Sequence, residues 1–81
     1  DRLVASEDLL DEARKIADSI MQGSPFSHSR HKALVYEGLG SDLGSHMQRN
    51  TAALVECMES EDHKEGVAAF LERRAPAFTG R

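Results

Sequence analysis

The chain has 81 residues, of which 40% are hydrophobic and 30% are charged, and its formal net charge is -4 at pH 7. This length allows at most one small domain, and the composition is that of a globular chain rather than a disordered tail. The negative charge argues against nucleic acid and anionic membranes as partners, because both require a basic face. No apolar run approaches the roughly 18 residues that span a bilayer, and no signal peptide is visible. The sequence therefore predicts a soluble protein of the cytoplasm, with the mitochondrial matrix as the alternative compartment.

The first half of the chain predicts two helices. In residues 6–21 the apolar side chains recur at steps of three and four, which places them on one face of a helix. They are Leu9, Leu10, Ala13, Ile16, Ala17, Ile20 and Met21. Gly23 is a helix stop, and Ser24 followed by Pro25 is typical of an N-cap and a first helical residue. We expect this second helix to continue to about Leu39.

The second half predicts two further helices. The third covers about residues 41–59, with an apolar stripe of Leu43, Met47, Leu54, Val55 and Met58. A fourth begins near Ser60 or Asp62, because Asp62 and Glu65 fit a capping-box variant while Ser60 is a competing cap. We expect Pro76 to end this helix, after a shared face formed by Val67, Phe70, Leu71 and Arg74. The sequence thus predicts an all-α fold of three to four short helices.

The four histidines and the single cysteine are the candidates for a metal site. His28 and His31 are three residues apart and can share a helix face, with His46 and His63 elsewhere. A structural zinc site needs about four well-placed ligands, and Cys57 falls inside an apolar helical pattern. We therefore expect solvent-exposed histidines, a buried and reduced thiol, and no metal site.

The acidic residues are the candidates for acid–base catalysis. Glu56, Glu59 and Asp62 follow one another at steps of three and could cluster. A general acid or base needs a pocket that shifts its pKa, and a chain of this size offers little concavity. A solvated acidic face is the preferred interpretation. The sequence also lacks a Gly-rich phosphate loop and a nucleophile with a patterned base, so we predict no catalytic residue in this chain.

Residues 60–81 carry the most specific pattern of the sequence. Its parts are a Ser- and Asp-rich helix start, Glu65-Gly66-Val67, two alanines before Phe70-Leu71, Glu72-Arg73-Arg74, and a Pro-x-Phe-x-Gly-Arg end. This combination resembles the C-terminal tail of the crotonase (enoyl-CoA hydratase/isomerase) family, and residues 1–10 look like the family's passage from its catalytic core into its helical C-terminal region. The resemblance covers nearly the whole chain but only the last third or so of such an enzyme. It implies that residues 1–81 are a C-terminal helical region without the catalytic core.

Phe70 and Arg73 are the candidate binding residues. At positions i and i+3 of the predicted helix, the ring and the guanidinium can face the same spot. From the residues alone, Phe70 would be a core residue and Arg73 a surface charge. The resemblance implies instead that these two motif positions help to hold the adenine and phosphate end of coenzyme A at a subunit boundary. The family's usual Lys is Arg73 here, which keeps the charge and changes the donor geometry.

The resemblance also implies the chemistry and the partners of a parent enzyme. That enzyme would add water across the double bond of 2-enoyl-CoA thioesters in fatty acid metabolism, or carry out a related isomerase reaction. It would hold no tightly bound cofactor, take an acyl-CoA thioester as substrate and assemble as a trimer-based homo-oligomer. The isolated chain is expected to be inactive and to form a dimer. The alternative is a free-standing helical interaction module without catalytic activity.

Overall fold

The computed structural model describes residues 2–81, and over this range the chain is helical and forms no strand. The elements are a short 3-10 turn, η1 (Ser6–Asp8), and four helices: α1 (Leu9–Met21), α2 (Pro25–Gly38), α3 (Leu43–Glu59) and α4 (Glu61–Glu72). An extended tail, residues 73–81, follows α4. The predicted all-α fold with four short helices is confirmed. None of the helices in the described range is long and apolar enough to cross a membrane.

The sequence signals at the helix starts act as capping residues. Three helices share one geometry, in which a side-chain oxygen accepts a hydrogen bond from the backbone N–H three residues later. These bonds run to Ser24 from Ser27 (3.2 Å), to Asp42 from Ser45 (2.9 Å) and to Ser60 from His63 (3.0 Å). Of the two caps considered for α4, Ser60 is therefore the one used, which leaves Asp62 free for other contacts.

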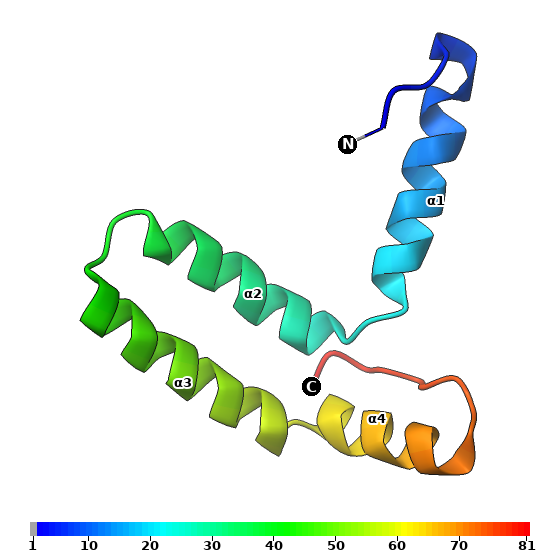
Figure 1. Ribbon diagram of the computed structural model, residues 1–81. Coiled ribbons are helices and arrows are strands. Elements are labelled where there is room, and N and C mark those ends of the chain that lie inside the picture. The colour runs from blue at the N-terminus through cyan, green and yellow to red at the C-terminus, as the bar shows by residue number, and fades with distance from the viewer. Residues whose placement is uncertain (1) are drawn as a thin grey trace.

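The helices form one thin layer. Helices α2 and α3 lie side by side as an antiparallel hairpin, α4 continues beyond α3, and the tail returns along α4 to the start of α2 (Figure 1). The molecule measures 45 × 39 × 16 Å, and its smallest dimension is little more than the roughly 10–12 Å of one helix with its side chains. Its radius of gyration is 16.1 Å, against about 12 Å for a compact chain of this length.

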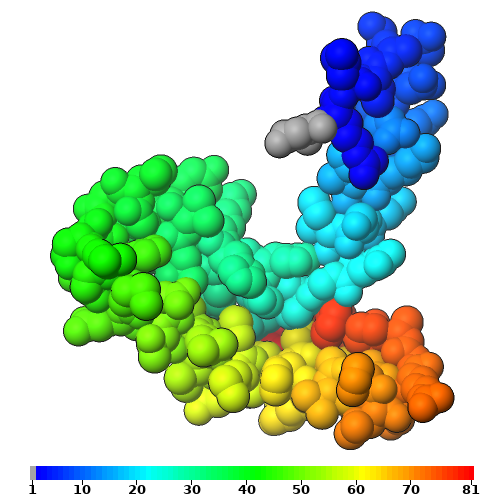
Figure 2. Space-filling model, viewed as in Figure 1, coloured from blue at the N-terminus to red at the C-terminus, as the bar shows by residue number. Residues whose placement is uncertain are grey.

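Helix α1 stands apart from the other three, with a wide gap between it and α2 (Figure 2). The total exposed surface is 6697 Å², whereas a compact monomer of this size exposes about 4,800 Å². Large apolar side chains along α1, α3 and α4 account for much of this surface. Examples are Leu10, Ile20, Met47, Leu54, Phe70 and Leu71, each more than half exposed. The helices therefore present apolar faces that this chain alone does not cover.

Buried residues are correspondingly few. In the described range they are two alanines, Ala53 and Ala69, and two polar residues, Ser60 and Asp62. The expectation that Cys57 is buried is wrong, because its thiol is only half-buried in the thin layer. Phe70 is 81% exposed, so the expectation from the residues alone that it is a core side chain is also wrong for this chain.

Candidate functional site

The end of α4 is an unusual chain reversal. The residue after the helix, Arg73, adopts the left-handed backbone conformation with φ 55° and ψ 44°. The N–H of Arg73 donates to the carbonyl oxygen of Phe70 at 3.3 Å, and the N–H of Arg74 donates to that of Ala69 at 3.0 Å, as in a Schellman motif. Glycine is the usual residue at this position, and a side chain there costs about 1 kcal/mol. Other contacts must therefore hold the reversal.

The reversal corrects two sequence predictions. We expected the helix to run to Pro76, with Arg74 on its apolar face, whereas α4 ends at Glu72 and Arg74 lies beyond it. Arg73 is consequently not a helical neighbour of Phe70 at i+3. A hydrogen bond from the Arg73 N–H to the Phe70 carbonyl still joins the two residues, but it joins their backbones and not their side chains.

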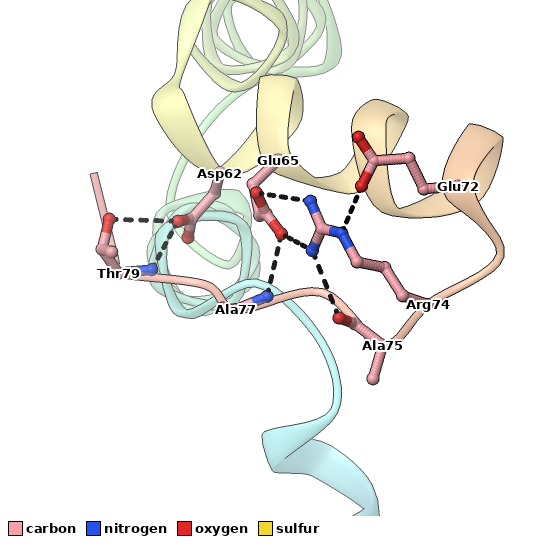
Figure 3. A network of polar contacts seen from close by, with 7 residues as sticks. All are labelled: Asp62, Glu65, Glu72, Arg74, Ala75, Ala77 and Thr79. Carbon is pink, nitrogen blue, oxygen red and sulfur yellow. Dashed lines mark hydrogen bonds and ion pairs between the residues drawn. The ribbon is translucent and has the colours of Figure 1, made fainter.

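An ion-pair network stabilises the reversal (Figure 3). Arg74 donates through Nη1 and Nη2 to the two carboxylate oxygens of Glu65, and through Nε to Glu72 at 2.6 Å. Glu65 also accepts a hydrogen bond from the backbone N–H of Ala77 at 3.1 Å. The bonds from Arg74 and then Ala77 outweigh partial burial and hold the pKa of Glu65 below its ordinary value. Glu65 thus connects both sides of the turn that contains Arg73.

A second carboxylate, Asp62, forms hydrogen bonds with the rest of the tail. Its Oδ2 accepts a hydrogen bond from the Ser24 hydroxyl at 2.7 Å, and its Oδ1 accepts one from the Thr79 N–H at 2.8 Å. The Gly80 N–H lies 3.1 Å from both oxygens, and the Asp62 N–H donates to the Arg81 carbonyl at 2.8 Å. Asp62 therefore joins three segments: the start of α2, the start of α4 and the C-terminal tail.

The environment of Asp62 overturns part of the predicted acidic face. Its side chain is only 2% exposed, whereas Glu56 and Glu59 are exposed as expected and Glu56 pairs with Arg30 at 2.6 Å. Burial alone would raise the pKa of Asp62, but the hydrogen bonds from Ser24 and the tail N–H groups hold that pKa below its ordinary value. The position in the first turn of α4 also favours a negative charge.

Phe70 and Arg73 are both exposed, and they differ in what lies around them. Phe70 lines a mainly apolar groove of about 420 Å³ together with Val67, Leu71 and the tail residue Phe78, among others. Arg73 does not line this groove, and its side chain makes no hydrogen bond or ion pair with any residue in the range 2–81. The site therefore offers an exposed aromatic ring and, one chain reversal away, a cation without an internal partner.

The histidines do not form a common site. His28, His31 and His63 are exposed, as expected, whereas His46 is half-buried against Gly38. In the part of the chain that the structure describes, no group of three His, Cys, Asp or Glu residues could hold a metal ion. The carboxylates that matter in the structure, Asp62 and Glu65, bind backbone and arginine donors instead. The sequence signal for them was their place in the first turns of α4, but it gave no indication of their partners in the tail.

Comparison with known proteins identifies the family. The profile of the enoyl-CoA hydratase/isomerase family matches residues 1–81. The chain therefore belongs to the enoyl-CoA hydratase/isomerase family, and the resemblance noted in the sequence is confirmed. The match is to the C-terminal helical part of the relatives.

Individual relatives agree with this assignment. A probable enoyl-CoA hydratase, echA8, of Mycobacterium tuberculosis is 38% identical over 80 residues, which are 99% of this chain and 31% of the relative. The crotonyl-CoA hydratase of Syntrophomonas wolfei is 34% identical over the same shares of the two chains. A crystal structure of a probable enoyl-CoA hydratase/isomerase from Mycobacterium abscessus superimposes with a TM-score of 0.91 at 31% identity, over 100% of this chain and 32% of that one. The chain thus spans about a third of the length of its relatives.

Proposed function

We propose that this chain is the C-terminal helical region of an enzyme that adds water across the double bond of 2-enoyl-CoA thioesters. The proposal assigns no catalytic residue to residues 1–81, because the oxyanion-binding and acid–base groups would belong to the core that precedes this region in the relatives. Family membership and relatives that are named as enoyl-CoA and crotonyl-CoA hydratases support it. The role of the chain is to cover that core, to build subunit contacts and to contribute to the coenzyme A site.

The observation that carries the proposal is an exposed Phe70 ring on α4 and, at the chain reversal directly after this helix, an exposed Arg73 whose side chain has no hydrogen-bond or ion-pair partner in residues 2–81. An aromatic ring offers a flat apolar surface for a purine, and a guanidinium offers charge and directed donors for phosphate. We assign these two side chains to the adenine and phosphate end of the acyl-CoA substrate. That substrate binds reversibly, and no tightly held cofactor is part of the proposal.

The uncovered surface supports a place inside a larger assembly. The chain exposes 6697 Å², which is about 1,900 Å² more than a compact monomer of its size. A standard interface covers only about 800 Å² on each partner. The additional exposed area is therefore large enough for more than one interface. The catalytic core and neighbouring subunits of a trimer-based homo-oligomer would supply these contacts. A cytoplasmic location fits the bacterial relatives, and a mitochondrial one fits the human relative whose name includes "mitochondrial".

The test uses the full-length protein that carries this chain. Arg73→Glu should raise the KM for a short 2-enoyl-CoA about tenfold or more, since it removes a charge-assisted contact to the nucleotide end. It should leave kcat within about twofold, because that contact is equal in the ground and transition states. Arg14→Glu, which changes an exposed arginine of α1 in the same way, should leave both constants unchanged.

Two controls separate this proposal from its alternative. The isolated 81-residue chain should show no hydration of the enoyl thioester, measured as loss of its conjugated absorbance. If the full-length protein also shows no turnover with any enoyl-CoA while its helices are folded, the free-standing interaction module becomes the better interpretation. If turnover is normal but Arg73→Glu leaves the KM unchanged in a correctly assembled enzyme, Arg73 is only a surface charge.

A further inference from the structure

Two consecutive arginines after α4 have opposite surroundings. Arg74 is held by two carboxylates, Glu65 and Glu72, whereas the Arg73 side chain has no partner in the range 2–81. The backbone of Arg73 is in the left-handed region, which a residue with a side chain enters only when its neighbours hold it there. The ion pairs of Arg74 with Glu65 and Glu72 therefore stabilise the fold. They also hold the turn from which the Arg73 side chain projects.

Glu65 is the residue on which this arrangement depends most. It binds Arg74 through both carboxylate oxygens and also accepts the N–H of Ala77, so it spans the reversal from the helix to the tail. Its side chain is 26% exposed, compared with 61% for Glu72, so solvent competes less for its bonds. Within residues 2–81, removing Glu65 would break the two hydrogen bonds from the Nη atoms of Arg74 and the one from the Ala77 N–H, whereas removing Glu72 would break only the hydrogen bond from Arg74 Nε.

We propose that Glu65 is a positioning residue for acyl-CoA binding. It acts through Arg74 to hold the left-handed turn from which the Arg73 side chain projects, at the end of the helix that carries Phe70, where the phosphate end of the substrate would lie. This inference rests on the proposed function, because it takes Arg73 as the residue that contacts the ligand. Glu65 itself touches no substrate.

Charge and position predict opposite effects when Glu65 is neutralised. Glu65→Gln removes a negative charge close to a site for phosphate, and electrostatics alone would then tighten substrate binding. If Glu65 positions Arg73, the same substitution loosens the turn and weakens binding. The direction of the change in KM therefore distinguishes positioning from a simple field effect.

The experiment measures KM and kcat of the full-length enzyme with two substrates. One is a short 2-enoyl-CoA, and the other is the same acyl group on pantetheine, which lacks the nucleotide. Glu65→Gln should raise the KM for the CoA thioester roughly three- to tenfold and leave kcat within about twofold. It should leave the KM for the pantetheine thioester unchanged. The control Glu61→Gln neutralises an exposed carboxylate of the same helix whose one ion pair within residues 2–81 is with Lys64, and it should not raise either KM.

A double substitution completes the test. In an Arg73→Ala background, Glu65→Gln should add almost nothing to the KM for the CoA thioester, because the residue through which it acts is gone. If the Glu65→Gln enzyme does not assemble, the Arg74→Lys variant is used in its place. Lysine keeps the positive charge but cannot donate to both carboxylate oxygens of Glu65 as the guanidinium does. Arg74→Lys should raise the KM for the CoA thioester alone.

The failures of the two ideas are distinguishable. If Arg73→Ala raises the KM for the CoA thioester but Glu65→Gln or Arg74→Lys leaves it unchanged or lowers it, the positioning role is overturned and the proposed function stands. Equal increases for both substrates, or full additivity with Arg73→Ala, also overturn it. If Arg73→Ala itself changes nothing, the assignment of Arg73 to the ligand fails first.

Discussion

Ser24 and Asp62 lie 38 positions apart in the sequence and are joined by a hydrogen bond of 2.7 Å between the Ser24 hydroxyl and Asp62 Oδ2. Ser24 is at the same time the N-cap of α2, since its oxygen accepts the Ser27 N–H. The same carboxylate holds the N–H groups of Thr79 and Gly80. One buried side chain therefore ties the start of α2 to both the start of α4 and the tail, in a molecule that has almost no apolar core.

The first prediction concerns this carboxylate. Asp62→Asn keeps the shape of the side chain but replaces one acceptor oxygen with an NH₂ group, which cannot accept the bonds that both oxygens accept now. Hydrogen exchange at the Thr79 and Gly80 amides should become about tenfold faster or more, measured by NMR at constant pH. Asp18→Asn, an exposed position of α1, is the matched control. Unchanged protection of both tail amides in Asp62→Asn would show that the tail is held by other contacts.

The pH dependence of stability should follow Asp62 and Glu65. Hydrogen bonds lower the pKa of both carboxyl groups in the folded chain, below the unfolded values of about 3.9 for Asp and 4.3 for Glu. Their stabilising contribution is thus fully present above the unfolded pKa and is lost as the pH falls through the folded pKa. The melting temperature, followed by circular dichroism, should drop below about pH 4.

The variant carrying both Asp62→Asn and Glu65→Gln isolates this effect. It should melt at a lower temperature than the unmodified chain at neutral pH, and the two melting temperatures should converge as the pH falls through the folded-state pKa values of the two groups. A residual slope is expected from Glu12 and Asp42, whose pKa values are also lowered, by the Lys15 ion pair and by hydrogen bonds from Ser45 respectively. Parallel curves for the two proteins over the whole range would contradict the assignment.

Two glycines should respond in opposite ways to alanine. Gly66 lies inside α4, and an added Cβ would meet the Phe78 ring at 3.7 Å, an ordinary contact. Gly66→Ala should stabilise the chain by about 0.5–1 kcal/mol, since glycine loses more backbone entropy in a helix. Gly80 has φ 82°, so Gly80→Ala should destabilise by about 1–2 kcal/mol. Chemical denaturation of the three proteins should give this order, and a destabilised Gly66→Ala would mean that Phe78 packs more tightly than described.

The uncovered apolar faces predict self-association of the isolated chain. Leu9, Ile16 and Ile20 lie on the stripe of α1 and are 61%, 39% and 56% exposed. Burial of such surface stabilises by roughly 25 cal/mol per Å², so we expect a two-fold dimer in sedimentation equilibrium. Introducing lysine at both Ile16 and Ile20 should shift the equilibrium toward monomer, whereas Asp18→Lys on the opposite face should not. A compact monomer at high protein concentration would contradict this prediction.

The sequence predicted local features of the fold more successfully than distant contacts. The apolar periodicity placed α1, α3 and α4, and Gly23, Ser24 and Pro25 marked the start of α2, because these signals act over one or two turns. The contacts of Asp62 with Thr79 and Gly80 join positions that no local pattern relates. The sequence did not predict the reversal at Arg73 for a different reason. The glycine that usually marks such a helix end is absent, and the carboxylates of Glu65 and Glu72 stabilise the reversal instead.

For the candidate site, a sequence motif pointed to Phe70 and Arg73, and the structure shows how the backbone around them is arranged. Phe70 and Arg73 came from a motif, but the motif could not show that the helix ends between them. The motif also could not show that Arg74 forms ion pairs while Arg73 forms none within residues 2–81. The ion pairs of Arg74 depend on the position of Glu65 on α4 and on the path of the tail that returns along this helix. The apolar stripe of α4 suggested a buried Phe70, yet burial depends on what covers the stripe, and within residues 2–81 Phe70 stays 81% exposed.

The position of Asp62 also predicts an order of folding events. The α2–α3 hairpin uses contacts between neighbouring elements and can form as soon as both helices exist. The bonds of Asp62 require Ser24 and Gly80 to arrive together, so they close only after the hairpin and α4 are in place and after residue 80 has been synthesised. Loss of the Asp62 carboxylate should therefore accelerate unfolding and leave the folding rate nearly unchanged. We therefore expect the tail to join the native structure late and to leave it early.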